Sequence, residues 1–380
     1  MASNDKVVVT NEKQGFLSKI TSSFTGIIVG ILLLFGGISL LWWNEQNNVK
    51  NIKNVKELRD QVIEVSSSKV DDEYDGKLIS TNGKFTYNES VITDDAFKVS
   101  AQTPVLVRIV EVYQWVESSE TKDDKTTYTY SKEWSEKLVD SSKFNTPTGH
   151  ENPVDVKYQS ERFETEETLK IGAYNLISDF KQLLPANKNV AIEEGIELPE
   201  GYKINNKYIT NSEDVTTPAI GDIRISYTKN DWKEASVLGK QKDDTIGAYT
   251  TKKNTNIKKI VEGIKNSEEI IGGIEKANKM SKWMFRILGS LLIIMAVSSI
   301  LGPLTTILGF IPFLGKIVNS MIGVVSFLIG LSISLVVIAI AWFAARPIVS
   351  IVLIAIVVGL IVALVYYKKN NKAVPAEKTN

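Results

Sequence analysis

Residues 284–301 read MFRILGSLLIIMAVSSIL, residues 321–344 read MIGVVSFLIGLSISLVVIAIAWFA, and residues 348–367 read IVSIVLIAIVVGLIVALVYY. Each run is roughly 18–24 residues long, and a helix of that length crosses a hydrocarbon core of about 30 Å. Lipid offers no partner to an open backbone amide, so these runs must be helical. A soluble protein would need a very large core to hide all of them. We therefore predict transmembrane helices at residues 283–302, 321–345 and 348–367.

Another apolar run, FTGIIVGILLLFGGISLLWW, occupies residues 24–43. A cleaved signal peptide is the alternative, but its apolar region is typically about 7–15 residues long and is followed by small residues. This run instead ends in Trp42 and Trp43, which are typical of a membrane interface. We therefore predict a retained signal anchor, preceded by a polar N-terminal arm over residues 1–23. Glycines in the run offer small faces for close helix contact.

The long segment between the first and second spans is polar, and its pattern changes from helical to β. Apolar residues recur at helical spacing from Val49 to Val62. Residues 105–116 and 126–134 are rich in β-branched and aromatic side chains, which predicts a long hairpin. We therefore predict a mainly-β domain over residues 44–255, and the predicted fold class is an α+β membrane protein. Further predictions are strands at 202–209, 221–228, 234–240 and 245–250, and a short helix near 176–184.

Three connecting segments complete the predicted organisation. Residues 256–282 return to helical spacing and predict an amphipathic stalk helix, which either docks on the domain or lies at the membrane surface. Residues 303–320 are apolar but broken by Pro303 and Pro312, so we predict an interfacial or re-entrant segment. The tail over residues 368–380 is rich in lysine.

The distribution of basic residues predicts the orientation. Three lysines precede the first span, and four follow the last one. With four spans both termini share one side, which the positive-inside rule assigns to the cytoplasm. The β domain is then extracytoplasmic. Arg346, in the turn between the last two spans, lies on the far side and runs against the rule.

Composition excludes several function classes. The chain of 380 residues has 44 basic and 44 acidic side chains, one histidine and no cysteine. Zero net charge argues against a nucleic-acid partner, and cysteine-based metal sites are impossible. No Gly-x-Ser-x-Gly elbow or nucleotide-binding loop is present, and a single histidine cannot build a two-histidine metal site. We predict no enzymatic activity, cofactor or metal, with His150 holding a loop by hydrogen bonds.

Ionisable residues are nearly absent from the spans, which argues against a charge-lined path for protons or ions. Arg286 stands near the start of the second span, and Arg346 at a span boundary. In the third span small residues recur three or four positions apart and share one helix face, which predicts close helix packing. This packing face consists of Gly323, Ser326, Gly330 and Ser334. Its expected neighbour is span four of the same chain or a second copy of the protein, and the sequence does not distinguish them.

With this order of segments, the chain resembles the transmembrane protein 43 family, also called LUMA. The resemblance covers most of the chain but departs at residues 160–201. The strings that carry it are Asn44-Glu45, residues 112–117 (VYQWVE) with Trp115, Tyr130, Glu133-Trp134, Gly149-His150, Asn152-Pro153, residues 221–224 (GDIR), Trp342, and Arg346-Pro347.

The resemblance implies four spans, cytosolic termini, oligomerisation and a role in membrane organisation without a known enzymatic activity. We therefore expect a non-enzymatic scaffold whose partners are the lipid bilayer, further copies of itself and another membrane or envelope protein. A channel or transporter subunit with a pore among the C-terminal spans is the alternative, and an envelope hydrolase using His150 is a third reading. The lysine- and asparagine-rich composition favours a bacterial plasma membrane, or an endomembrane in a eukaryote.

Overall fold

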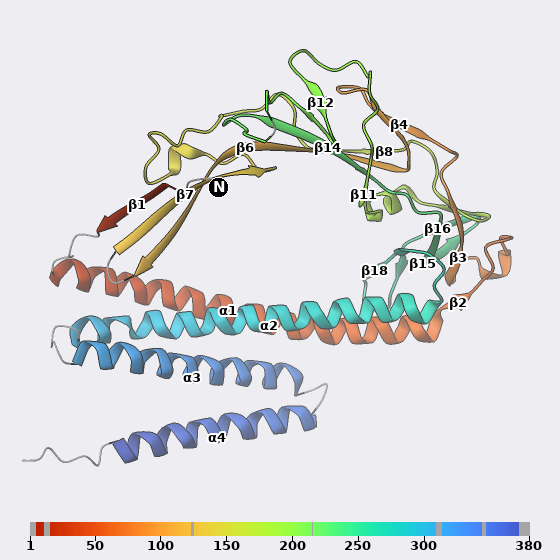
Figure 1. Ribbon diagram of the computed structural model, residues 1–380. Coiled ribbons are helices and arrows are strands. Elements are labelled where there is room, and N and C mark those ends of the chain that lie inside the picture. The colour runs from red at the N-terminus through yellow and green to blue at the C-terminus, as the bar shows by residue number, and fades with distance from the viewer. Residues whose placement is uncertain are drawn as a thin grey trace, which may run out of the picture. The chain divides into compact units, whose positions relative to one another are not determined.

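A computed structural model of the chain describes residues 5–10, 16–122, 125–214, 216–308, 314–343 and 347–371 (Figure 1). The chain divides into two compact units. The polar unit comprises Met1–Lys13 and Leu58–Ile270, and the membrane unit comprises Gln14–Glu57 and Ile271–Asn380. Two long helices, α1 (Phe16–Gln61) and α2 (Ser267–Leu308), contribute residues to both units.

Three described helices are long and apolar enough to cross a membrane, within Thr25–Gln61, Ser267–Pro303 and Ile322–Trp342. They belong to α1, α2 and α3 (Leu314–Trp342), which confirms the predicted spans one, two and three as helices of membrane length. Helix α4 covers Pro347–Asn371. Its apolar part with described side chains, Ile354–Tyr367, is shorter than the 18 residues that a candidate span needs. The fourth crossing therefore stays a prediction.

The N-terminal arm differs from its expected form. Strand β1 (Asp5–Thr10) pairs antiparallel with β7 (Lys125–Ser135), in a register that sets Val7 opposite Tyr128. Strands that pair must lie on the same side of a bilayer. The predicted cytoplasmic arm over residues 1–23 would lie across the bilayer from the polar unit, so the β1–β7 pairing argues against that position.

The predicted stalk helix is wrong over its first part. Residues Asn256–Ile257 and Lys259–Glu262 form strands β18 and β19, and α2 begins only at Ser267. The apolar residues there are β-branched, and β19 pairs with β15 (Glu234–Lys242), placing Ile260 opposite Val237. Sheet pairing with a distant strand thus overrides the helical spacing of a short window.

Local chemistry sets the start of α2. The side chain of Asn266 accepts a hydrogen bond from the Glu269 amide at 2.8 Å. In return, the Glu269 carboxylate accepts a hydrogen bond from the backbone N–H of Asn266 at 3.0 Å. This reciprocal arrangement is a capping box, which satisfies amides that have no partner in the first helical turn.

The segment predicted to be interfacial or re-entrant is largely helical. Helix α2 continues through Pro303 to Leu308, and α3 begins at Leu314. Residues 309–313, which include Pro312, lie outside the described part of the chain. Both described ends of the segment thus extend the neighbouring helices. Helical backbone does not set a position relative to the bilayer, so the interfacial or re-entrant placement of 303–320 stays a prediction.

The polar unit contains an eight-stranded sheet with the main order β1-β7-β6-β14-β13-β12, to which β8 and β11 are added. Its central feature is the predicted hairpin of β6 (Val105–Lys122) and β7, which is confirmed. Residues 202–209 fold as two strands rather than one. The remaining strands are β8 (Glu161–Glu164), β11 (Lys188–Asn189), β12 (Lys203–Asn205), β13 (Tyr208–Thr210) and β14 (Ile223–Lys229).

A seven-stranded sheet follows the order β19-β15-β16-β10-β9-β3-β2. Its other members are β2 (Ile63–Glu64), β3 (Leu78–Thr86), β9 (Lys170–Ile171), β10 (Tyr174–Leu176) and β16 (Thr245–Gly247). Two small sheets pair β4 (Val91–Asp94) with β5 (Val99–Gln102), and β17 (Tyr249–Thr250) with β18. Short 3-10 helices lie at Asp72–Tyr74, Ser141–Lys143 and Ser178–Leu183.

Two hydrophobic cores hold these sheets. One contains Phe85, Tyr174, Phe180 and Val237 around the seven-stranded sheet. The other contains Phe97, Ile225 and Tyr227 around the eight-stranded sheet. The mainly-β character of the polar unit therefore rests on alternating inward-facing residues, such as the buried alternate positions of β14.

Candidate functional site

The membrane unit contains a buried ion pair between α1 and α2. Arg286 donates from Nε and Nη2 to the two carboxylate oxygens of Glu45, at 2.6 and 3.0 Å. The Glu45 side chain is 0% exposed and the Arg286 side chain 17%. A charge removed from water is tolerated only when a partner of opposite sign and good geometry compensates it. Each residue therefore depends on the other.

Small residues bring α1 and α2 close enough for this pairing. A Cβ on Gly37 would lie 2.7 Å from Cγ1 of Ile293, and a Cβ on Gly30 would lie 2.9 Å from the carbonyl oxygen of Ala296. Both distances are shorter than real Cβ contacts allow. At these two positions the first span therefore needs glycine, because side-chain or backbone atoms of α2 lie where a Cβ would be.

The surroundings of the pair are amphipathic. The Asn44 side chain donates to the carbonyl of Lys282 at 3.1 Å, which ties the same two helices together. The Arg286 guanidinium lies 5.0 Å from the ring centre of Trp283 and 6.0 Å from that of Trp342. Aromatic faces stabilise a cation at such distances. Helices α1, α2 and α3 thus meet at one cluster of charge and tryptophan.

Exposed tryptophans mark this end of the helices as a membrane interface. Trp43 is 52% exposed and Trp283 57%. The ring of Trp43 contacts Phe285 edge-on, with ring centres 5.5 Å apart. Tryptophan concentrates where the apolar core meets the headgroups. We therefore expect the Glu45–Arg286 pair at the border of the hydrocarbon layer rather than at its centre.

A groove of about 480 Å³ runs along α2 and α3 from this cluster. Its polar end is formed by Lys282, Arg286 and Trp342, and the rest of its wall is mainly apolar. The apolar wall includes Ile294, Phe327 and Leu331. Two basic residues thus line one end of the groove, and most of its remaining described lining is apolar.

Gly330, one of the predicted packing residues, contacts α2. A Cβ at this position would lie 2.7 Å from Cγ1 and 2.8 Å from Cα of Ile294. The expected neighbour was the fourth span or a second copy, whereas the structure places the second span against Gly330. Ser334 is buried and donates to the Gly330 carbonyl at 2.8 Å.

The other two predicted packing residues, Ser326 and Gly323, differ from Gly330 in their contacts. Ser326 is buried, and its hydroxyl has no hydrogen-bond partner among the described residues. Gly323 has open space where a Cβ would be. Only part of the predicted packing face therefore makes a close helix contact in a single chain.

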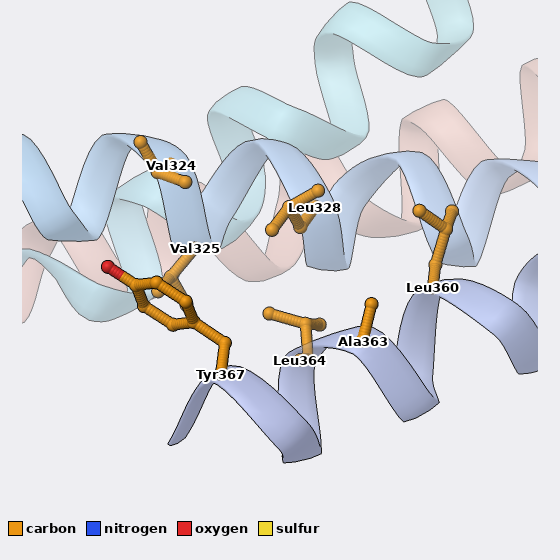
Figure 2. Close-up of a pocket in the computed structure, with 7 residues that line it drawn as sticks. All are labelled: Val324, Val325, Leu328, Leu360, Ala363, Leu364 and Tyr367. Atoms are coloured by element: carbon orange, nitrogen blue, oxygen red, sulfur yellow. The ribbon is translucent and has the colours of Figure 1, made fainter. Parts of the chain in front are cut away.

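A second cavity, of about 490 Å³, lies between α3 and α4 (Figure 2). The Tyr367 side chain of α4 points towards α3, and its hydroxyl is the one polar side-chain group among the lining residues that the structure describes. The remaining lining residues are Val324, Val325, Leu328, Leu360, Ala363 and Leu364. None of the lining residues that the structure describes is charged.

His150 lies in the polar unit, in an aromatic cluster. Its ring stacks on the Tyr130 ring, with ring centres 3.8 Å apart. The His150 and Trp115 rings meet edge to face, with ring centres 4.7 Å apart. Nδ1 of His150 is 2.9 Å from the Thr146 carbonyl oxygen. Burial, and a hydrogen bond from its hydroxyl to Glu117, raise the pKa of Tyr130 above its ordinary value. The cluster anchors the loop after β7 to the long hairpin.

Asn152 extends the same anchor. Its amide accepts from the Trp115 backbone at 2.7 Å and donates to the Trp115 carbonyl at 2.9 Å. The Asn152 side chain thus satisfies the backbone N–H and carbonyl of Trp115, as a neighbouring strand would do. Gly149 has a positive φ of 86°, and Pro153 follows Asn152 directly. The Gly149–Pro153 string therefore builds a loop against the hairpin.

Trp134 belongs to a separate cluster. The Arg224 guanidinium lies 4.6 Å from the ring centre of Trp134 and 5.0 Å from that of Tyr208. Arg224 also donates two hydrogen bonds to Glu111, at 2.6 and 2.7 Å.

Arg346 lies outside the described residues, and only the backbone of Pro347 is described, so the Arg346-Pro347 motif has no structural account. Across the described residues, no group of three or more histidine, aspartate or glutamate side chains is placed to hold a metal ion.

Comparisons with known proteins agree with this architecture. The family model described as "Transmembrane protein 43" matches residues 112–347, which is more than half of the chain. The chain belongs to the transmembrane protein 43 family. The matched region begins in β6 and ends where α4 begins, so it includes the long hairpin, Arg286 and Trp342.

Animal relatives match over nearly the whole chain. Transmembrane protein 43 of Homo sapiens is 25% identical over 391 residues, covering 98% of this chain and 96% of the relative. The Mus musculus protein is 25% identical over 364 residues, covering 90% of each chain. The homolog from Drosophila melanogaster is 25% identical over 339 residues, covering 85% of this chain and 89% of its own. No solved structure matches.

Family membership makes the chain an integral membrane protein. It does not decide the source, so the bacterial membrane expected from composition stays a prediction. The Glu45–Arg286 pair is not among the site residues predicted from the sequence. The signal was available: Glu45 follows the tryptophans of the first span, and Arg286 is a rare charge inside the second. Two lone opposite charges at the same depth of neighbouring spans indicate a pair.

Proposed function

We propose that the chain is a non-enzymatic membrane scaffold, which organises lipid or membrane proteins by self-association and by partner binding through its polar unit. The observation that supports it best is how the membrane unit uses its polar groups. Glu45 and Arg286 neutralise each other, and Asn44 bonds to the α2 backbone. These groups join helices, which is a structural role.

The same geometry weighs against a pore through α3. Two serines that could line a channel donate within their own helix: Ser332 to the Leu328 carbonyl and Ser334 to the Gly330 carbonyl, each at 2.8 Å. Gly330 faces Ile294 at contact distance rather than an open space. These contacts favour helix packing over conduction.

We also propose an orientation. The lysines of the C-terminal tail favour the cytoplasm, and the polar unit then lies outside the cytoplasm if α4 crosses the membrane. The N-terminal arm is subject to two opposed effects. Its lysines favour the cytoplasm, whereas the pairing of β1 with β7 requires the side on which the polar unit lies.

The experiment that separates the two function classes is an ion-flux measurement. Full-length protein is reconstituted into liposomes loaded with a potassium-sensitive dye, next to empty liposomes and liposomes that contain a known channel. A scaffold leaves the flux at the level of empty liposomes. Flux that rises with the protein-to-lipid ratio, and changes when Ser332 and Ser334 are replaced by leucine, would favour the channel.

A further inference from the structure

We propose that a pocket on the eight-stranded sheet of the polar unit binds a small carboxylic acid built on a single ring, with the carboxylate at Arg224 and Lys207. The pocket has a volume of about 340 Å³. It is lined by Trp134, Asn205, Asn206, Lys207, Tyr208 and Arg224. This site goes beyond the scaffold function and does not rest on it, because the whole lining belongs to the polar unit of one chain.

Neighbouring strands of the sheet bring the lining residues together. Trp134 lies on β7, Arg224 on β14, and Tyr208 at the start of β13. Strands β12 and β13 pair so closely that a turn of two residues, Asn206 and Lys207, connects them. Asn206 has a positive φ of 54°, a backbone form that asparagine adopts in tight hairpin turns. The turn therefore fixes the Lys207 backbone beside the strand that carries Arg224.

Arg224 has donor capacity that its partner within the sheet does not use. Its Nε and Nη2 donate to the two carboxylate oxygens of Glu111, at 2.6 and 2.7 Å. Its Nη1 makes no hydrogen bond among the described residues. A guanidinium presents five N–H donors in a fixed, planar fork. Glu111 thus holds the orientation of the fork, and the Nη1 end remains available to a carboxylate of the ligand.

The charges of the pocket favour an anion. Arg224 and Lys207 are the charged residues among its described lining, and both are basic. Glu111 compensates the charge of Arg224. The Lys207 ammonium lies 5.2 Å from the ring centre of Tyr208 and forms no ion pair with any described residue. The second positive charge therefore attracts a carboxylate, which hydrogen bonds from charged donors then hold.

The rest of the lining determines the body of the ligand. The rings of Trp134 and Tyr208 are its apolar part, and the side-chain amides of Asn205 and Asn206 are further polar groups. Apolar walls with a few polar groups are typical of small-molecule sites, whose volumes are about 300–1,000 Å³. At about 340 Å³ the pocket lies at the lower end of that range. It therefore suits a single ring, which is either the aromatic ring of an aryl acid or the sugar ring of a uronic acid.

Another pocket in the polar unit provides the opposite case. Its volume is about 310 Å³, and its described lining contains Glu136 and Asp155 but no basic residue. Size alone would let both pockets accept the same ligand. The charges favour a carboxylate at the Arg224 pocket and disfavour it at the Glu136 pocket.

The test is a ligand-observed NMR titration of the full chain in lipid discs, with benzoate and glucuronate as the acids and with empty discs as the blank. Benzamide and glucose are the matched neutral compounds. At least one acid should bind saturably, with a dissociation constant below about 1 mM, and its neutral counterpart should bind at least about tenfold more weakly. Benzoate binding assigns the site to aryl acids, and glucuronate binding assigns it to sugar acids.

Variants of Lys207 test the role of charge. Lys207→Gln should weaken binding of the acid roughly tenfold, as expected for the loss of one hydrogen bond between charged groups. Lys207→Arg keeps the charge and should retain binding. Lys188→Gln is the matched control, because Lys188 is exposed on β11 of the same sheet and does not line the pocket. Lys207 is also exposed, so the two glutamine variants are comparable in their effect on the fold.

A further pair of variants tests the location. Asn205→Trp fills the Arg224 pocket and should abolish saturable binding, whereas Gln159→Trp fills the Glu136 pocket and should leave it unchanged. Aromatic side chains are well tolerated in strands, and Asn205 ends β12. Thermal melts of all variants establish that they remain folded.

Three results would overturn the proposal. If neither acid binds saturably, the pocket is not a site for such ligands. If an acid and its neutral counterpart bind equally, the carboxylate is not what the protein recognises. Equal effects of Lys207→Gln and Lys188→Gln, or undiminished binding by folded Asn205→Trp, would place the binding elsewhere on the molecule.

Discussion

Arg286 of α2 donates two hydrogen bonds to Glu45 of α1, and the carboxylate that receives them is completely buried. The pair joins residues 241 positions apart in the chain. It also explains why a charge occurs within an apolar span: the charge belongs to a contact between helices.

Single substitutions in this pair should be costly. Glu45→Ala leaves the guanidinium without its partner, and Arg286→Ala leaves the carboxylate, so we expect each to destabilise the membrane unit by about 3–5 kcal/mol. The double variant Glu45→Leu/Arg286→Met should lose much less than the sum, because no uncompensated charge remains. Thermal melts of the full chain in detergent give the comparison. Additive losses would contradict a direct pair.

The Gly330–Ile294 contact predicts an asymmetry within one helix face. Gly330→Leu should cost about 1–3 kcal/mol, because the new side chain would overlap the α2 backbone. Gly323→Leu is the matched control, since a Cβ at Gly323 meets nothing within 4 Å. Melting temperatures of the two variants are compared with the wild type. Equal effects would mean that α2 does not pass Gly330 at this distance.

The pairing of β1 with β7 can be tested by cross-linking, because the chain contains no cysteine of its own. Val7→Cys/Tyr128→Cys should form a disulfide on mild oxidation of the full chain in membranes, because these residues are partners in the register. Val7→Cys/Lys132→Cys is the control, since Lys132 is four residues further along β7 and about 13 Å away.

The disulfide also decides the side of the N-terminal arm. A cross-link between Val7 and Tyr128 means that the arm and the polar unit share one side of the membrane. If neither pair cross-links, and a reporter at the N-terminus is accessible only from the cytoplasm, the arm follows the lysine count and β1 does not pair with β7 in the membrane.

Replacing His150 should weaken the polar unit. The ring is buried, stacks on Tyr130 and approaches the Thr146 carbonyl, so His150→Ala should cost roughly 1–3 kcal/mol. Val154→Ala is the control, because Val154 is 96% exposed in the same loop. Urea unfolding followed by tryptophan fluorescence would measure both. Unchanged stability of His150→Ala, together with loss of a hydrolytic activity, would indicate a catalytic histidine.

The first three spans and the long hairpin could be predicted because their signals are local. An uncharged run of 18 residues or more has few alternatives to a membrane helix, and the aromatic alternation of residues 105–134 determines its own pairing. Helix α1 shows the limit of this approach. The sequence indicates its span and the helical pattern from Val49 to Val62 separately, whereas the span and the pattern belong to one helix that ends at Gln61.

The elements that the sequence predicts wrongly are those whose structure depends on segments far away in the chain. Residues 259–262 have apolar spacing that suits a helix, but β15 supplies a strand edge that their β-branched side chains fit better. Strand β1 depends in the same way on β7. The neighbour of Gly330 could not be chosen from small-residue spacing, because that pattern shows a face and not the helix that covers it.

The central claim is that the protein acts as a scaffold by associating with itself, and the most direct measurement is the mass of the full chain in lipid discs over a range of concentrations. One chain has a mass of 42.2 kDa. After correction for lipid, the account predicts a multiple of this mass that persists when the discs are diluted. A single chain per disc at every concentration and in every lipid mixture would contradict it.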